Sequence, residues 1–178
     1  MTVRRVAMSQ PSRPRWLMPL ALLAVFCCTP TDTVPALDLD ATTVTDRVQI
    51  FLISPEDNGA TGRKVGCGDS AVPVEVALPS PTLALEGSLQ ALLAHDSRYD
   101  STTGLYNPLY ASPLEVEVIQ YIGAEARVRL KGYIEVGGDC DGPRMLAQLT
   151  ETALQFPDVQ QVFFYLGDKP LRDLLGKR

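Results

Sequence analysis

Apolar residues alternate with other residues along several stretches of this sequence, and each alternation predicts a β-strand. The first stretch runs through Val48, Ile50 and Leu52. The residues between them are also largely apolar, so we expect a strand that is covered on both faces. The second stretch occupies residues 72–78. Because proline cannot donate to a β-ladder, Pro73 places this second strand at a sheet edge or at its own beginning.

In two later stretches the apolar residues recur at the spacing of an α-helix. Ser80, Pro81 and Thr82 supply capping residues for a first helix. Its buried stripe consists of Leu85, Leu89, Leu92 and Leu93. A second helix begins near Pro143 and ends before Pro157. Its apolar positions are Leu146, Leu149, Ala153 and Phe156. Each helix therefore buries one face.

A β-hairpin is predicted between the helices, with its turn at residues 122–124. Its apolar side chains then face one another across the pair: Leu114, Val116 and Val118 on one arm, and Val128 and Leu130 on the other. The same register places Glu117 beside Arg129 on the wetter face. It also places Glu115 beside Lys131, and opposite charges across a strand pair favour that register.

A last strand is predicted at residues 162–166, where both alternating sets are apolar, which favours a central position. A short helical turn from Leu171 to Leu175 follows. The elements succeed one another in the order ββα, hairpin, αβ. We therefore predict an α+β fold with a single mixed sheet of about five strands and two helices packed on it.

The N-terminus is typical of an export signal. Four arginines precede an uncharged apolar run from Trp16 to Cys28, which is shorter than the roughly 20 residues that span a bilayer. Residues 1–36 are therefore predicted to be a signal peptide cleaved near Ala36, or an uncleaved N-terminal anchor that would be the only membrane contact. Residues 37–46 read as a flexible tether, and 47–178 as the folded domain.

Composition agrees with one globular domain. The chain has 178 residues, of which 46% are hydrophobic and 21% charged. Residues 29–178 hold 12 basic and 21 acidic side chains, a difference of −9. Such a surface repels phosphate backbones, so nucleic acid is excluded as an expected partner.

The segment 96–113, here called the tyrosine loop, is the longest connection in the predicted domain. Loops of this length are uncommon in compact domains and are often functional. We expect Tyr99, Tyr106, Asn107 and Tyr110 to form a surface for a partner or ligand. In the alternative interpretation, the tyrosines only seat the loop on the core.

Few residues suggest catalysis. Residues 68–70 (Gly-Asp-Ser) resemble the serine block of GDS-type hydrolases, but the only histidine, His95, ends the first helix. A serine hydrolase that uses Ser70 is therefore kept only as an alternative. Residues 139–142 hint at a calcium loop, yet most ligands are missing, and capping of the second helix by an aspartate explains them as well. We expect no catalytic residue, metal or cofactor.

Several short runs resemble one protein family. They lie at 66–70 (Gly-Cys-Gly-Asp-Ser), 104–108 (Gly-Leu-Tyr-Asn-Pro) and 152–157 (Thr-Ala-Leu-Gln-Phe-Pro). Together with others spread over about 47–176, they resemble the GerMN family. The resemblance implies a domain of sporulation, germination and envelope lipoproteins, usually outside the membrane and without known catalysis. A good lipobox before Cys27 is absent, which puts a lipid anchor in doubt.

A disulfide between Cys67 and Cys140 is predicted, because these are the only cysteines after the leader and export leads to oxidising surroundings. Each lies in a glycine-rich turn, which gives the backbone freedom to reach bridging geometry. Two unrelated buried thiols are the alternative.

These observations favour a non-catalytic binding or assembly module of the bacterial cell envelope, outside the cytoplasm. Its expected partner is an envelope protein or a cell-wall component, or a further copy of the chain. A serine hydrolase and a structural spacer or ring-forming subunit are the other two classes.

Overall fold

The computed structural model describes residues 39–176. The predicted signal or anchor at 1–36, with Cys27, lies outside the described residues. The strands are β1 (Val44–Ser54), β2 (Arg63–Val65), β3 (Asp69–Leu83), β4 (Leu114–Ile122), β5 (Glu125–Gly132), β6 (Gln161–Leu166) and β7 (Lys169–Pro170). The helices are η1 (Gly66–Gly68), α1 (Ala84–Ala94), α2 (Asp141–Leu154) and α3 (Leu171–Leu175). None of the described helices has the length and apolar character needed to cross a membrane.

The fold is α+β, as predicted, but it contains two sheets instead of one. The first has the order β1-β3-β2 and the second the order β4-β5-β6-β7. All strand pairs are antiparallel except β5 with β6. The prediction of a single five-stranded sheet is therefore wrong, because the two early strands pair with each other whereas the hairpin pairs with β6. The edge position predicted from Pro73 is wrong too: β3 is the central strand of its sheet, with Pro73 inside it, and β1 lies at the edge.

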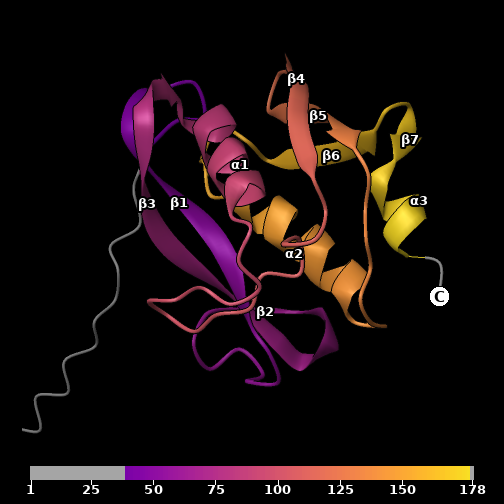
Figure 1. Cartoon of the computed structure of the whole chain (residues 1–178). Coiled ribbons are helices and arrows are strands. Elements are labelled where there is room, and N and C mark those ends of the chain that lie inside the picture. The colour runs from indigo at the N-terminus through magenta and orange to yellow at the C-terminus, as the bar shows by residue number, and fades with distance from the viewer. Residues whose placement is uncertain (1–38, 177–178) are drawn as a thin grey trace, which may run out of the picture. The chain divides into compact units, whose positions relative to one another are not determined.

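The helices α1 and α2 lie between the two sheets (Figure 1). Side chains from both sheets and from the three α-helices meet in one core, including Ile50, Leu52, Leu85, Leu89, Val128, Leu130, Met145, Leu149, Phe164 and Leu171. The predicted stripe of α1 is buried except at Leu93, which is only partly covered. Burial of these apolar surfaces is the main source of stability for such a domain.

The first helix begins later than predicted. β3 continues through residues 80–82 to Leu83, so these residues do not cap α1, and no side chain does. The first N–H groups of the helix donate instead to backbone carbonyls: Ala84 to Thr43 at 2.8 Å and Leu85 to Ala41 at 3.0 Å. Backbone acceptors thus replace the predicted side-chain cap.

The same contacts show that the folded domain begins earlier than predicted. Ala41 is fully buried, and its N–H donates to Asp158 at 2.8 Å. β1 begins at Val44, before the predicted domain start at Arg47. From residue 39 the segment predicted as a tether therefore belongs to the packed structure, because its carbonyls are needed at the N-terminus of α1.

The register of the hairpin differs from the prediction in its first arm. The turn is at residues 123–124, because Ile122, predicted to be in the turn, is the last residue of β4, and Glu115 pairs with Lys131 at 2.9 Å as expected. A bulge between Val116 and Val118, however, places Val118 opposite Arg129. The predicted pairing of Glu117 with Arg129 is wrong, because the extra residue shifts every later side chain to the other face. Ile119 therefore packs against the core while Val118 is exposed.

The outer edge of β1 is covered by the helix α2 and not by another strand. Gln155 donates to the carbonyl of Gln49 at 2.9 Å, and Gln148 to the carbonyl of Phe51 at 3.0 Å. The N–H of Phe51 donates to the hydroxyl of Thr152 at 3.1 Å. Gln148 and Thr152 lie in α2 and Gln155 is its C-cap, and with spacings of four and three positions they lie on one face of the helix. They satisfy backbone groups that would otherwise stay unpaired.

This arrangement predicts the effect of Thr152→Val. The variant keeps the shape of the side chain but leaves the N–H of Phe51 without its acceptor, so the free energy of unfolding should fall by about 1–3 kcal/mol. Equilibrium urea unfolding measures the change. Thr150→Val on the same helix is the matched control, because no hydrogen bond of the Thr150 hydroxyl occurs among the described residues. Equal losses in both variants would contradict the role of Thr152.

Candidate functional site

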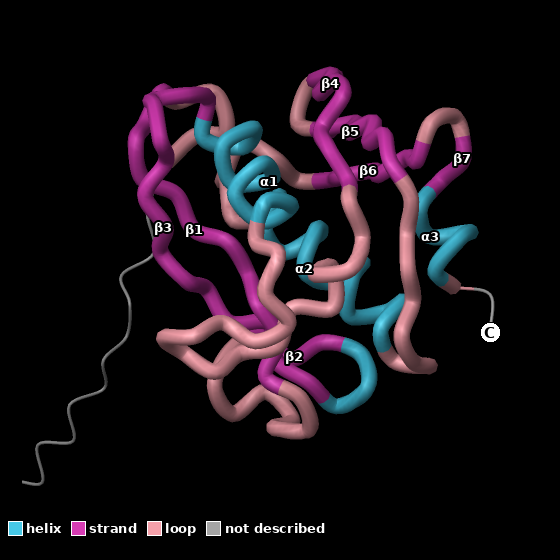
Figure 2. The backbone as a smooth tube through the Cα atoms, in the orientation of Figure 1, coloured by secondary structure: helices cyan, strands magenta, loops and turns pink. Residues whose placement is uncertain are grey.

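The tyrosine loop is fastened to the end of β1. Tyr106 and Ile53 exchange two backbone hydrogen bonds, of 2.7 and 2.9 Å. A second bridge joins Tyr106 to Tyr99 within the loop. Figure 2 shows the loop beside the lower ends of β1 and β3, near β2. The loop therefore covers the outer edge of β1 at Ile53, next to the part of that edge that α2 covers.

Asp100 fixes the turn at the tip of the loop. Its carboxylate accepts from the N–H groups of Thr102 (3.2 Å) and Thr103 (2.7 Å) and from the Thr103 hydroxyl (2.7 Å). The Thr103 hydroxyl is the main reason that the pKa of Asp100 is lowered. Gly104 follows with φ of 72°, a conformation that favours glycine.

Asn107 holds the loop from inside. It is fully buried, donates to the carbonyl of His95 at 2.6 Å and accepts from the N–H of Leu109 at 3.1 Å. The expectation that Asn107 contributes to a contact surface is therefore wrong. Its polar groups are used to join the loop to the end of α1.

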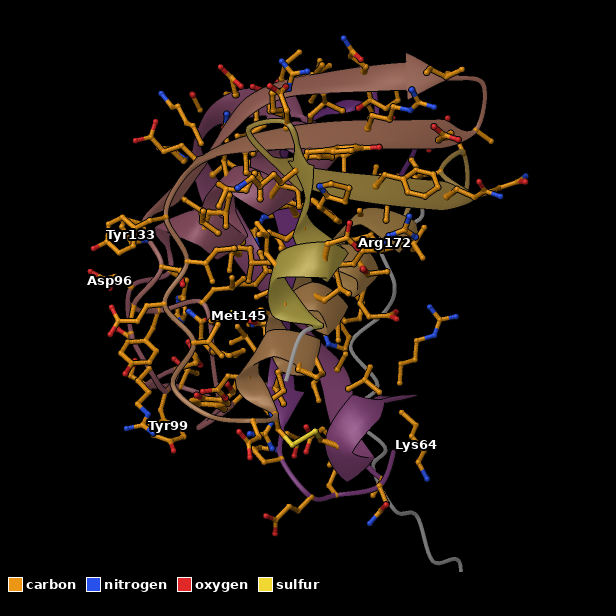
Figure 3. All side chains as sticks on the ribbon, turned by 90° about the vertical axis from the view of Figure 1, so that its right-hand side faces the viewer. Lys64, Asp96, Tyr99, Tyr133, Met145 and Arg172 are labelled. Carbon is orange, nitrogen blue, oxygen red and sulfur yellow. A yellow bond between two sulfur atoms is a disulfide. The ribbon has the colours of Figure 1, made fainter. Side chains whose placement is uncertain are left out.

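The three predicted tyrosines gather around one cation. The guanidinium carbon of Arg98 lies 5.7 Å from the ring centroid of Tyr99 and 5.8 Å from those of Tyr106 and Tyr110. We call these four residues the Arg98 cluster. Tyr99 and Tyr110 are 56% and 39% exposed, whereas Tyr106 is buried. Figure 3 shows Tyr99 at the outer edge of the molecule. A partner can reach the cluster through its two outer rings.

Tyr106 links the Arg98 cluster to the base of α2. Its hydroxyl donates to Asp141 at 3.0 Å, and its ring is packed against Tyr99 at a centroid distance of 5.5 Å. Burial, and then the hydrogen bond to Asp141, raise the pKa of Tyr106 to about 12. The phenol therefore stays neutral and in place at physiological pH.

An ion-pair network around Arg144 also contacts Tyr106. Arg144 donates to Asp69 in two hydrogen bonds, of 2.7 and 3.1 Å, and lies 3.6 Å from Asp141. Its guanidinium carbon is 5.7 Å from the ring centroid of Tyr106. Asp69 is fully buried and also accepts from the N–H of Glu56. The hydrogen bond to Asp69 is the main reason that the pKa of Arg144 is raised.

A disulfide joins Cys67 and Cys140, the pair predicted from the sequence, with their Cα atoms 6.1 Å apart. It connects η1 to the residue before α2, and Figure 3 shows it as a yellow bond. Asp69 and Asp141 follow its two cysteines in the sequence by two residues and one residue. The covalent bond and the Arg144 ion pair thus hold the same two segments together.

A comparison with protein-family models identifies the family of the chain. Residues 51–172 match the family model named Germane, described as sporulation and spore germination. The chain belongs to this family. The resemblance to the GerMN family is thereby confirmed.

One solved structure is similar to the chain: the tandem GerMN domains of the sporulation protein GerM from Bacillus subtilis, at 11% identity and a TM-score of 0.46. The similarity covers 76% of this chain and 43% of that chain, so this chain spans less than half of the tandem protein. No curated protein matches the sequence.

The Germane domain does not bring Ser70 and His95 together. Ser70 is fully buried, and its hydroxyl donates to Asp57. That bond is the main reason that the pKa of Asp57 is lowered to about 2. The ring of His95 is oriented differently, with Nε2 3.9 Å from a carboxylate oxygen of Asp100. Neither a serine–histidine pair nor an accessible serine is present at this point of the fold.

Residues 139–142 also have another role than the sequence indicated. The N-cap of α2 is Cys140, and no side chain caps that helix, so the assignment of an aspartate cap is wrong. Asp141 instead accepts from Tyr106 and faces Arg144. Among the described residues, no group of three or more His, Cys, Asp or Glu side chains could hold a metal ion.

Sequence reasoning missed Arg98, Asp69, Asp141 and Arg144 as members of the site. Arg98 precedes Tyr99 directly, so a cation beside a cluster of tyrosines was the available signal. The other three come from segments up to 75 residues apart, and no local pattern connects them.

Removal of the disulfide should destabilise the Germane domain strongly. The paired variant Cys67→Ser with Cys140→Ser opens a loop defined by a sequence separation of 73 residues. The chain-entropy relation then gives a loss of about 4 kcal/mol in the free energy of unfolding. Urea unfolding with and without dithiothreitol measures it. Identical midpoints for the oxidised, reduced and variant proteins would contradict the prediction.

The phenol of Tyr106 should ionise above the ordinary pKa of tyrosine, near 10. Because its folded pKa is raised to about 12, its contribution to stability is complete below about pH 10 and is lost as pH rises through about 12. The difference in phenolate absorbance between the natural protein and Tyr106→Phe isolates this residue. A midpoint of that difference near pH 10 would show that Tyr106 is not held by burial and Asp141.

Proposed function

We propose that this Germane domain is a non-catalytic binding or assembly module of the bacterial cell envelope, working outside the cytoplasm. Its contact surface is the exposed part of the Arg98 cluster, and its partner is an envelope protein or a cell-wall component. The observation that carries the proposal is an ordered loop that keeps two tyrosines, Tyr99 and Tyr110, exposed beside a cation.

The surface has the physical properties of a binding site. Tyrosine offers a large apolar ring with a polar tip, and it loses little conformational entropy when bound. Tyr99 and Tyr110 are already held by contacts with Arg98, and Asn107 and Asp100 fix the backbone between and beside them. A surface that is ordered before binding loses less free energy on association.

Two observations support a place outside the cytoplasm. The Cys67–Cys140 bond belongs to an oxidising compartment, since cytosolic thiols are kept reduced. The sequence of residues 1–36 is typical of an export signal. A reporter enzyme fused after Arg178 that is active only when exported should be active in the source cells.

The position of Ser70 supports a function without catalysis. Its hydroxyl is buried and already used in the bond to Asp57, so a substrate has no access to it. An active-site serine probe should therefore leave the folded domain unlabelled. Labelling that disappears in Ser70→Ala would favour the hydrolase alternative.

Assembly through the hairpin is the second candidate. Val118, Tyr121 and Ile122 are 38%, 39% and 53% exposed on β4, which pairs with β5 on one side only. An open edge with exposed apolar residues can pair with another chain. This surface is distinct from the Arg98 cluster, so variants separate the two candidates.

The contact surface is tested with two double variants of the full chain. Tyr99→Ala with Tyr110→Ala should reduce capture of the partner from envelope extract by at least about tenfold, because exposed aromatic anchors carry a large share of binding energy. Tyr121→Ala with Ile122→Ala is the comparison pair, since these two side chains are 39% and 53% exposed on β4 and lie outside the tyrosine loop.

Unchanged capture by the first pair would refute the assignment of the contact surface to the tyrosine loop. Loss of capture by the second pair alone would favour assembly through the hairpin. Thermal unfolding of both pairs verifies that the folded domain is preserved.

A further inference from the structure

We infer that Arg98 is a carboxylate-binding residue, which takes a single carboxylate group of a partner protein between Tyr99 and Tyr110. The inference rests on the proposed function and names the chemical group that the contact surface recognises. The carboxylate is either the C-terminus of the partner or one of its Asp or Glu side chains.

The guanidinium of Arg98 is held without a carboxylate. Within residues 39–176, Arg47, Arg63, Arg127, Arg129 and Arg144 each lie within 4.0 Å of a carboxylate oxygen. Arg98 has no such ion pair and no side-chain hydrogen bond in this part of the chain; its contacts are the three tyrosine rings. A guanidinium carries five N–H donors, so those of Arg98 are available to a ligand.

Neither acid of the loop, Asp96 or Asp100, forms an ion pair with Arg98. Asp100 accepts three hydrogen bonds from Thr102 and Thr103, and its other oxygen faces the ring of His95 at 3.9 Å. Asp100 therefore holds the turn and does not neutralise Arg98. The cation lies over three aromatic ring faces, and no acceptor among the described residues uses its N–H donors.

Preorganisation makes this cation suited to a planar anion. Arg98 is exposed but contacts rings from both ends of the loop, and the backbone N–H of Asn107 donates to its carbonyl at 2.9 Å. Both its backbone and its side chain are therefore restrained before a ligand arrives. The fork of donors matches the two oxygens of a carboxylate, which gives specificity as well as affinity.

The charge of the domain selects against a polyanion. Residues 39–176 hold ten basic and nineteen acidic side chains, a difference of −9. A chain of phosphates would meet repulsion along its whole length, whereas a single carboxylate meets mainly the adjacent cation. Screening beyond about 8 Å at physiological salt favours the short-range attraction further.

The rings beside Arg98 favour a peptide as carrier of the carboxylate. Tyr99 and Tyr110 expose both ring surface and hydroxyl groups, which can cover apolar side chains and bind backbone groups at once. A peptide segment presents these two kinds of groups around its terminus or around an acidic residue. The arms of the experiment separate these two sources.

The test uses the full chain and three short peptides as probes. The probes are acetyl-Ala-Ala with a free C-terminus, acetyl-Ala-Glu-Ala-amide and, as neutral control, acetyl-Ala-Gln-Ala-amide. The Nε–Hε signal of Arg98 is followed by NMR during titration. We expect a saturable shift with one of the two carboxylate probes and none with the neutral control.

Variants assign the shift to the guanidinium fork. With the ring signals of Tyr99 as readout, Arg98→Gln should weaken binding at least about tenfold, as expected for loss of a charge-assisted hydrogen bond. Arg98→Lys keeps the charge without the fork and should give an intermediate loss. Arg172→Gln is the matched control, because Arg172 also lacks an ion pair among the described residues and lies on another element. It should bind as the natural protein does.

Two results would overturn the inference: no shift with either carboxylate probe, or equal binding by Arg98→Gln and Arg172→Gln. Its failure is separable from that of the proposed function. If Tyr99→Ala with Tyr110→Ala abolishes capture while Arg98→Gln leaves it unchanged, the contact surface stands and the carboxylate site is wrong.

Discussion

The outer edge of β1 is the constraint on which the rest of the fold depends. Its alternate residues, Gln49, Phe51 and Ile53, direct backbone groups away from β3, and no strand pairs with them. Two side chains of α2, the side chain of its C-cap Gln155 and the backbone of Tyr106 bind these groups. Because buried backbone groups must be paired, this one edge fixes both the helix and the loop against the first sheet.

That edge also explains why the site forms where it does. Once Tyr106 is paired with Ile53, its ring lies over the start of α2, where Asp141 and Arg144 meet it. Arg144 reaches back to Asp69 at the start of β3, beside the disulfide. The Arg98 cluster is thus connected, through Tyr106, to the backbone of β1, to the ion pairs of Arg144 and to the segments joined by the disulfide.

Local periodicity could predict the long elements, because β3, β5, α1 and α2 each show one apolar face in the sequence and β1 shows two. It could not predict the division into two sheets, since alternation identifies a strand but not its partner. β2 and β7 have three and two residues, too few for any period. The bulge beside Glu117 could not be predicted either, because the registers with and without it both satisfy the apolar pattern.

The tyrosines of the loop could be identified as candidate site residues, because aromatic residues are unusual in a polar segment. Which of them are buried and which are exposed could not be predicted. Tyr106 and Asn107 have the residue types of a contact surface, yet they are buried because they join the loop to β1 and α1. A loop of this length remains ordered only when some of its polar groups are used in this way. The residues that give the loop its order are therefore unavailable to a partner, and the exposed Tyr99 and Tyr110, with Arg98 between them, are those left to bind one.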